Sequence, residues 1–319
     1  MFPHVAQYYR DVLERQVFVL RIISYRTSIH TPWQAGFEMD GRVVSATATH
    51  NYENQPPTVR ALLEAGPTAV QKALASAERL ISSEEQTLHT LADVEVGAPI
   101  PDPDKIICLG LNYADHAAET NAQLPQHPIL FAKFRNSLIG PQAPIVLPRF
   151  STEIDYEAEL AVVIGRTCKD VSAEDALSYV AGYTIMNDVS ARDWQFHTGQ
   201  WMAGKAIDTF APMGPGIVPA SEVPDPQHLK VFTRLNGAVV QDGTTAQMIF
   251  NIAQSIEYIS TVMTLVPGDI ISTGTPAGVG FARKPPLYLH EGDRVEVEIE
   301  HIGTISNPVV GGVQSGSPS

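Results

Sequence analysis

Three carboxylates are the strongest candidates for chemistry in this sequence. Glu157 and Glu159 lie in an alternating acidic run, residues 153–160, and Asp188 lies in a second acidic segment, residues 187–193. Alternate residues of a β-strand point to the same side, so the two glutamates are expected to lie together. Carboxylates placed so close repel each other and are costly to desolvate, and a divalent cation relieves both effects. Oxygen ligands without nearby Cys or His ligands favour Mg²⁺, Mn²⁺ or Ca²⁺ over zinc.

A purely structural interpretation fits the same spacing equally well. Glu153, Asp155, Glu157 and Glu159 could form the solvated face of an edge strand. The spacing alone does not separate the two interpretations, and the other motifs of the chain favour the functional one.

His116 and Glu119 form a second candidate pair, which follows a predicted strand at 105–109. In a helix, a spacing of three residues puts both side chains on one face. A carboxylate beside an imidazole orients the ring, which suits a group that takes up and releases a proton near neutral pH. The alternative is a surface pair without function, which is the commoner outcome for an isolated His-x-x-Glu.

Lys205 follows Gly204 and precedes a mostly apolar segment, residues 206–214. Most lysines are solvated, but a lysine close to carboxylates and a metal can stabilise an enolate oxygen.

Small residues fill segment 272–280, where they would let the backbone approach a ligand or simply form a tight turn. The glycine patterns of nucleotide-binding loops and of serine hydrolases do not occur in the sequence.

Composition excludes several classes of protein. The chain has 319 residues, of which 44% are hydrophobic and 18% charged, and these values are typical of a globular protein with a sizeable core. A formal charge of −14 argues against nucleic acid or an anionic membrane surface as a partner. The two cysteines, Cys108 and Cys168, lie in apolar segments and are predicted to be buried thiols in a reducing compartment.

The order of predicted elements favours an α+β protein. Three prolines in segment 96–103 mark the clearest boundary in the chain. Helices are predicted over 172–180 and 251–263, and a further helix capped by Thr68 is predicted to carry Val70, Leu74, Ala77 and Ile81 on its apolar face. Helices do not alternate with strands, which disfavours a doubly wound sheet. The predicted strands are 18–24, 41–45 (as part of a hairpin), 105–109, 161–164, 229–235, 269–272 and 294–300.

Five motifs follow one another along the chain. They are Gly110-Leu-Asn-Tyr-x-x-His116, Tyr156-Glu-Ala-Glu-Leu160, Asn187-Asp-Val-Ser-Ala-Arg-Asp193, Gly204-Lys205 and Thr273-Gly-Thr-Pro-x-Gly-Val-Gly280. In this order they resemble the fumarylacetoacetate hydrolase family. The resemblance extends from about residue 105 to 310 and is nearest to the domain-containing-protein-2 branch, which is associated with oxaloacetate keto–enol tautomerisation.

The resemblance implies a role for each candidate residue. It implies that a bound Mg²⁺ or Mn²⁺, with Ca²⁺ as an alternative, is held by Glu157, Glu159 and Asp188. It also implies that Lys205 contacts substrate and that His116 and Glu119 form a catalytic dyad on a lid. Gln195 and Thr275 match positions that contact substrate. Arg135 lies in a segment that shapes substrate choice, where it would bind a substrate carboxylate or simply be exposed.

The expected fold is α+β: a mixed β-sandwich or roll with peripheral helices, preceded by a small α+β domain. We predict an N-terminal accessory domain at 1–100, a catalytic domain at 104–311 and a flexible tail at 312–319. The expected function is a metal-dependent enzyme on a small 2-oxo carboxylate, in the order tautomerase, decarboxylase, C–C hydrolase of acylpyruvates or 1,3-diketo acids. A metal-stabilised binding or assembly protein is the non-enzymatic alternative, but a structural ion would need only the carboxylates.

The expected partner is a small 2-oxo acid, and the expected assembly is a homodimer. Residues 1–16 are predicted to form a short helical extension, because they hold too many acids for a mitochondrial presequence. We therefore expect a cytoplasmic protein, with mitochondrial import as the alternative. No apolar run approaches the roughly 18 residues that suggest a membrane span.

Overall fold

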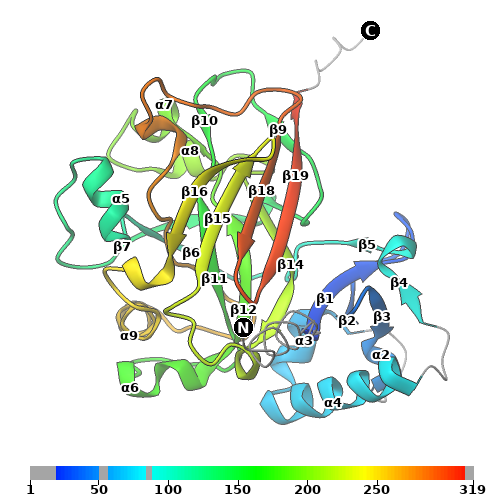
Figure 1. The fold of residues 1–319 in the computed structure, drawn as a ribbon. Coiled ribbons are helices and arrows are strands. Elements are labelled where there is room, and N and C mark those ends of the chain that lie inside the picture. The colour runs from blue at the N-terminus through cyan, green and yellow to red at the C-terminus, as the bar shows by residue number, and fades with distance from the viewer. Residues whose placement is uncertain (1–18, 50–56, 84–87, 313–319) are drawn as a thin grey trace, which may run out of the picture.

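The protein is described by a computed structural model that covers residues 19–49, 57–83 and 88–312. Two packed sheets make up the larger part, and a smaller α+β part built from the N-terminal residues lies at one side (Figure 1). The predicted helical extension at 1–16 and nearly all of the predicted tail lie outside the described residues. Within the described residues, no helix is both long and apolar enough to cross a membrane.

The larger sheet has twelve strands in the order β4-β3-β2-β1-β14-β12-β11-β17-β6-β7, with β5 beside β1 and β8 beside β14. Most pairs are antiparallel, whereas β6 is parallel to β17 and β8 is parallel to β14. Its strands are β1 (Arg21–Arg26), β2 (Gln34–Met39), β3 (Arg42–Ser45), β4 (His89–Thr90), β5 (Glu95–Val96), β6 (Ile106–Gly110), β7 (Ile129–Lys133), β8 (Leu138–Ile139), β11 (Ala158–Ile164), β12 (Val180–Asn187), β14 (Ala211–Pro219) and β17 (Ile270–Ser272).

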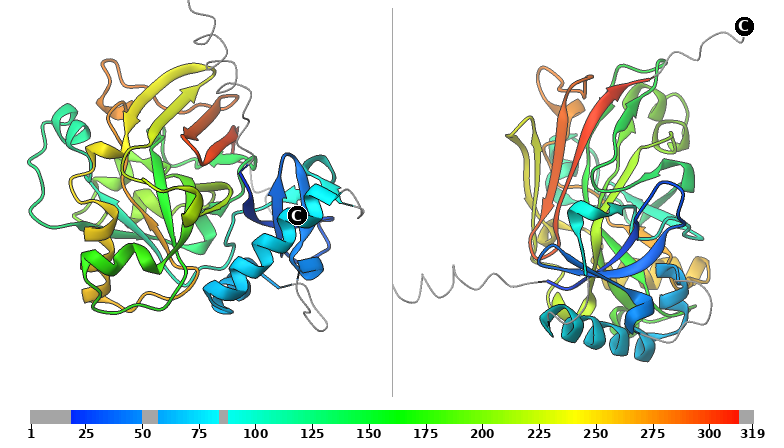
Figure 2. Two further views of the ribbon diagram at one scale, coloured as in Figure 1. Left: turned by 60° about the horizontal axis from the view of Figure 1, so that its bottom comes forward. Right: turned by 90° about the vertical axis from the view of Figure 1, so that its right-hand side faces the viewer.

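A second sheet of five strands packs against the larger one. Its order is β16-β15-β18-β19-β9. The right-hand view of Figure 2 shows β15, β16, β18 and β19, coloured yellow to red, as a layer beside green strands. Val231 of β15 and Val297 of β18 share one core with Leu160 and Val162 of β11. The strands are β9 (Ile145–Leu147), β15 (Lys230–Leu235), β16 (Ala238–Thr244), β18 (Arg294–Ile299) and β19 (Gly303–Gly311), and a separate pair is formed by β10 (Ile154–Asp155) and β13 (Ser190–Ala191).

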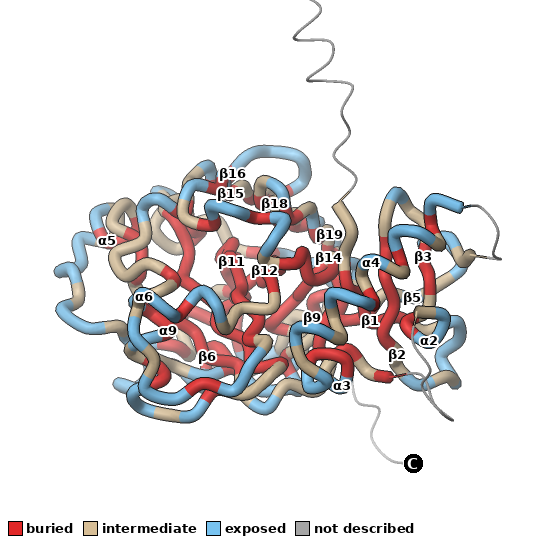
Figure 3. Tube along the Cα trace, turned by 90° about the horizontal axis from the view of Figure 1, so that it is seen from below, coloured by how far each residue is buried: buried red, intermediate tan, exposed pale blue. Residues whose placement is uncertain are grey.

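Alternation explains the burial of this second sheet. In both β15 and β18, every second residue is buried and the residues between are exposed or half-buried. This is the pattern of a sheet with one face on the core and one toward solvent. Figure 3 shows mostly buried strands such as β11, β12 and β14 in the interior and exposed segments around them. The predicted mixed α+β sandwich is confirmed.

The N-terminal part contains the predicted hairpin. Strands β2 and β3 pair around Asp40 and Gly41, whose φ values of 54° and 73° suit a tight hairpin turn. Ile22 of β1 pairs with Ile217 of β14, so the hydrogen bonding of the sheet continues from this part into the rest. The division into two domains near residue 100 stays a prediction.

Helices lie around the sheets. The predicted Thr68 cap is wrong, because α4 already begins at Pro67. Proline suits the first position of a helix, since it has no N–H group that would lack a hydrogen-bond partner there. The helix predicted over 172–180 is capped by Ser172 as expected, but it ends early and Val180 begins β12. The α-helices are α2 (Ala46–Thr49), α3 (Val59–Glu64), α4 (Pro67–Ser83), α5 (Ala114–Glu119), α6 (Ala173–Ala176), α7 (Arg192–Gln195), α8 (Met202–Lys205) and α9 (Ile252–Val262). The 3₁₀ helices are η1 (Leu91–Asp93), η2 (Arg135–Ser137), η3 (Leu177–Tyr179), η4 (Ala220–Glu222), η5 (Thr245–Gln247) and η6 (Gly280–Ala282).

Candidate active site

The three carboxylates singled out from the sequence meet at one end of the β11–β12 pair. Glu159 lies on β11, Glu157 lies just before it, and Asp188 follows the last residue of β12. Their nearest carboxylate oxygens all lie within 4.8 Å of one another, and the three side chains are buried. The Asp188 N–H donates to the Glu157 carbonyl over 2.9 Å, which ties the two segments together. The alternative of a solvated edge strand is wrong, because β11 is flanked by β12 and β17 on its two sides.

Lys205, at the end of α8, contacts two of these carboxylates. Its Nζ lies 2.6 Å from Glu157 Oε2 and 2.8 Å from Asp188 Oδ2. Burial lowers the pKa of Lys205, but the charges of Asp188 and Glu157 outweigh burial and hold that pKa above its ordinary value. The lysine is therefore a charged ammonium placed inside the acidic cluster.

Glu159 differs from its two neighbours in its partners. Its Oε2 accepts hydrogen bonds from Ser272 Oγ at 2.5 Å and from the Gly274 N–H at 3.0 Å. Its Oε1 makes no hydrogen bond to any residue that the structure describes, although the residue is only 1% exposed. Burial raises the pKa of Glu159, and the charges of Asp188 and Glu157 raise it further. A buried carboxylate with a free oxygen beside two others needs a proton or a cation, and this all-oxygen donor set fits a hard divalent ion.

His116 and Glu119 lie on α5 and contact each other. His116 Nδ1 lies 2.8 Å from Glu119 Oε1, and the Gly278 N–H donates to Glu119 Oε2 over 2.9 Å. Glu119 is thus fixed from one side by the loop after β17 and orients the imidazole from the other. The pair is not a free surface pair, because His116 is only 7% exposed.

A cavity of about 320 Å³ brings the two groups together. His116 lines it along with Glu157, Glu159 and Lys205, and Phe131 and Trp201 form part of its apolar wall. The rings of Phe131 and Trp201 meet edge to face with centroids 5.5 Å apart. A Cβ built on Gly110 would lie 2.1 Å from the Trp201 ring, so the wall can close only over a glycine.

The predicted substrate contacts divide into two groups. Gln195 and Thr275 line the same cavity as the acidic cluster. The Gln195 side-chain oxygen accepts a hydrogen bond from Arg192 Nη1 at 2.9 Å. The NH₂ group of Gln195 takes no part in this hydrogen bond. Arg135 lies elsewhere: it is exposed in η2 and borders a different hollow, next to Phe134. The structure does not bring Arg135 to the acidic cluster.

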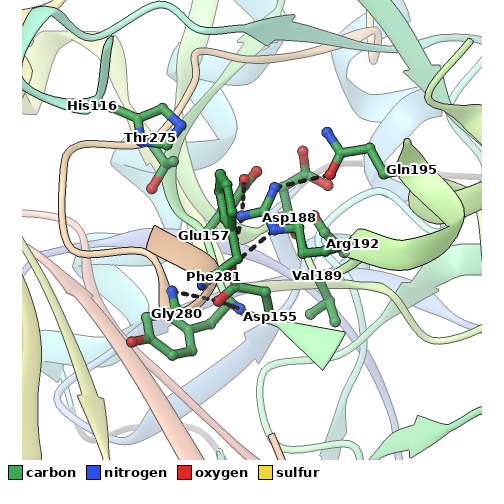
Figure 4. A network of polar contacts seen from close by, with 12 residues as sticks. His116, Asp155, Glu157, Asp188, Val189, Arg192, Gln195, Thr275, Gly280 and Phe281 are labelled. Atoms are coloured by element: carbon green, nitrogen blue, oxygen red, sulfur yellow. Dashed lines mark hydrogen bonds and ion pairs between the residues drawn. The ribbon is translucent and has the colours of Figure 1, made fainter. Parts of the chain in front are cut away.

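Arg192 was overlooked as a site residue, although it lies inside the second acidic motif. Its Nη2 lies 2.8 Å from Asp155 Oδ2 and 2.6 Å from Glu157 Oε1, and its guanidinium carbon lies 4.3 Å from the centre of the Phe281 ring (Figure 4). Breaking such a buried pair by removing one partner costs about 3–5 kcal/mol. One feature of the sequence could have identified Arg192 as a site residue: it lies between two aspartates in a segment whose other residues suit burial.

Asp155 has a structural place in this network. It accepts hydrogen bonds from the N–H groups of Gly280 and Phe281, at 2.7 and 3.1 Å, as well as from Arg192 (Figure 4). Both of its oxygens are therefore engaged. Asp155 joins the loop after β17 to the acidic cluster, whereas Glu157 and Glu159 face the cavity.

Comparisons with known proteins agree with this geometry. Residues 105–310 match the model of the fumarylacetoacetate (FAA) hydrolase C-terminal family. Over 259 residues, 80% of each chain, the protein is 48% identical to "Oxaloacetate tautomerase Fahd2a, mitochondrial" of Rattus norvegicus. It is 40% identical to "Oxaloacetate tautomerase fahd2, mitochondrial" of Xenopus laevis over 96% of this chain and 95% of that protein.

A solved structure supports the same grouping. The crystal structure of a putative HpcE protein from Mycobacterium smegmatis superposes with a TM-score of 0.78 at 31% identity. The superposition covers 92% of this chain and 100% of that chain. The family model, the relatives and the fold lead to one conclusion: the chain belongs to the fumarylacetoacetate hydrolase family.

Proposed function

We propose that the chain is a metal-dependent oxaloacetate tautomerase, which interconverts the enol and keto forms of this 2-oxo acid. The observation that carries the proposal is the buried cluster of Glu157, Glu159 and Asp188 with Lys205 inside it, beside the cavity that His116 also lines. The substrate itself is suggested by the names of the relatives.

Glu157, Glu159 and Asp188 are proposed to hold Mg²⁺ or Mn²⁺, with Ca²⁺ as an alternative. When bound there, such an ion would supply Lewis acidity toward the 2-oxo and carboxylate oxygens of the substrate. The free Oε1 of Glu159 supports this assignment, because it is the carboxylate oxygen of the cluster that lacks a protein partner among the described residues.

Lys205 and the dyad are proposed to carry the proton chemistry. Removing a proton from C3 of oxaloacetate puts negative charge on the 2-oxo oxygen, and the Lys205 ammonium beside the cluster would stabilise that charge. His116 would move the proton at C3, with its ring oriented by Glu119. Gln195 and Thr275 are proposed to contact the substrate, since both line the cavity. A contact from Arg135 gains no support from its exposed position outside this cavity.

Two other outcomes start from the keto form instead. Loss of carbon dioxide requires the bond from C3 to the β-carboxylate to align with the π system of the 2-oxo carbonyl, and it gives the enolate of pyruvate. Attack by water on a ketone carbonyl of an acylpyruvate would give C–C hydrolysis. Tautomerisation needs only reprotonation, for which the oriented imidazole of His116 is suited. We therefore place decarboxylase and hydrolase activity behind tautomerase activity.

Pre-formed enol-oxaloacetate tests the proposal. Mixed with metal-loaded enzyme, it is expected to lose its ultraviolet absorbance much faster than pyruvate or carbon dioxide is released. Pyruvate formed in equal amount at the same rate would instead make the protein a decarboxylase. If oxaloacetate gives no response while an acylpyruvate is cleaved, the protein is a hydrolase.

Assembly and location remain predictions. The homodimer expected from the sequence can be checked by light scattering of the purified chain. The names of both relatives describe them as mitochondrial, which favours the mitochondrial alternative over the cytoplasmic location expected from the sequence.

A further inference from the structure

Lys133 is a buried lysine with no role in the chemistry described so far. It is the last residue of β7, and its side chain is 0% exposed although Ala132 and Phe134 on either side of it are exposed. It does not line the cavity of the acidic cluster, so it is not placed to touch substrate. A fully buried lysine is rare unless its charge is paired, so its partners are informative.

Four oxygen atoms surround the Lys133 ammonium. Its Nζ lies 2.7 Å from Asp188 Oδ1 and donates to the carbonyl of Val189 at 2.9 Å, of Lys205 at 2.5 Å and of Phe210 at 2.7 Å. An ammonium has three N–H groups, and the three carbonyls take all of them, so the contact with Asp188 Oδ1 is an ion pair without a hydrogen bond. The side chain is therefore held in place rather than free to change partners.

These oxygens come from three separate segments of the chain. Asp188 and Val189 follow β12, Lys205 ends α8, and Phe210 immediately precedes β14. Lys133 thus ties the side chain of one proposed metal ligand to the main chain of the proposed enolate-stabilising lysine. The Asp188 carboxylate is held from two sides, by Lys133 at Oδ1 and by the Lys205 ammonium at Oδ2.

We infer that Lys133 is a positioning residue that fixes Asp188 and Lys205 relative to each other and so sets the cation affinity of the acidic cluster. The inference rests on the proposed metal site. With Oδ1 of Asp188 held by Lys133, Oδ2 is the oxygen turned toward Lys205 and Glu157. Removing Lys133 would free the carboxylate to rotate and would also release the end of α8.

The chain offers a matched control in Lys105. Its Nζ lies 2.9 Å from Asp269 Oδ2, and Asp269 is as fully buried as Asp188. This pair joins β6 to the turn before β17 and is not part of the acidic cluster. Lys105→Met therefore breaks a lysine–buried aspartate pair without touching Asp188 or Lys205.

The test compares Lys133→Met, Lys105→Met and the wild type by calorimetric titration of chelator-treated protein with Mn²⁺. We expect Lys133→Met to weaken binding about 10–100-fold, the range for losing a residue that orients a metal ligand. Lys105→Met is expected to lower the melting temperature and leave the affinity unchanged. Equal affinity in Lys133→Met and the wild type overturns the inference, whereas a wild type that does not bind Mn²⁺ refutes the proposed metal site itself.

Lys133→Ala provides a second route should the methionine variant fail to fold. Its missing atoms correspond to n-propylammonium, so adding this cation is expected to restore Mn²⁺ affinity, and n-propanol is expected not to. Equal recovery with the neutral alcohol would mean that Lys133 only fills space, and would overturn the inference.

Discussion

Replacing Glu159 with glutamine is expected to lower cation affinity and turnover together while stabilising the metal-free protein. Losing a residue that merely orients a ligand costs about 10–100-fold in affinity, so losing the ligand itself should cost at least about 100-fold. The free energy of unfolding of the metal-free protein should rise in this variant, because Glu159 is buried beside Asp188 and Glu157 and its pKa is raised by burial and by both charges. The neutral amide keeps the shape and removes the repulsion. Metal titration and denaturant unfolding in chelator measure the two effects.

The gain in stability of Glu159→Gln over the wild type is expected to depend on pH. Because the folded protein raises the pKa of Glu159, the folded state binds the proton more tightly than the unfolded chain does. The stability of the wild type relative to Glu159→Gln is therefore expected to fall as pH rises above the ordinary glutamate value of about 4.3. The stability difference should level off once the pH exceeds the raised pKa of Glu159 in the folded protein. Below the ordinary glutamate pKa, the charge of Glu159 should no longer contribute to the difference.

Glu153→Gln is the matched control for this experiment. Glu153 belongs to the same acidic run but is only half-buried, and the Tyr288 hydroxyl donates to its carboxylate at 3.3 Å. Its replacement is expected to leave both metal affinity and turnover near wild type. Unchanged metal affinity in Glu159→Gln would remove Glu159 from the site.

His116→Ala and Glu119→Ala are each expected to lower turnover by about 10²–10⁴-fold, the usual contribution of a positioned acid–base group. The double variant should lose no more than the worse single variant, because residues that act as one unit are not additive. The structural reason is the 2.8 Å contact between His116 Nδ1 and Glu119, whose other oxygen is held by Gly278. Steady-state kinetics of the two single variants and the double variant measure these losses of turnover.

A second His–carboxylate pair in the chain serves as the control. Asp225 and His228 have the same spacing and the same 2.8 Å contact, but their side chains are 61% and 70% exposed. Alanine at His228 is expected to leave turnover unchanged. Additive losses at His116 and Glu119, or full activity in His116→Ala, would contradict a shared role in proton transfer.

Local patterns predicted several helices and strands, but the three long strands β12, β14 and β19 were not predicted. The predicted stripe of Ile252, Ile256, Ile259 and Met263 indicated α9, and its three isoleucines are buried, whereas Met263 lies just beyond the last helical residue as the C-cap. Apolar runs such as 105–109 marked β6 to within one residue. These signals depend only on neighbours in sequence, which is why they can be read without the fold. The errors at Thr68 and Val180 concern element ends, where one proline or one strand start decides the boundary.

Burial of charged residues was harder to predict. The alternation of Glu157 and Glu159 indicated a shared side, but their burial depends on the pairing of β11 with β17, from a distant part of the chain. Lys133 and Arg135 show the same difficulty. They are two residues apart, yet one is enclosed by four oxygens and the other is exposed. Which charge is buried is decided by segments that meet only in the folded protein.

Hydrogen exchange at C3 of oxaloacetate tests the central claim most directly. In D₂O, enzyme loaded with Mg²⁺ or Mn²⁺ is expected to exchange the C3 protons, followed by NMR, well above the spontaneous rate and faster than pyruvate appears. Chelator-treated enzyme and Glu159→Gln are expected to lose this exchange, whereas Glu153→Gln keeps it. Exchange that is equally fast in Glu159→Gln, or that never exceeds pyruvate formation, would contradict a cation-assisted tautomerase at this acidic cluster.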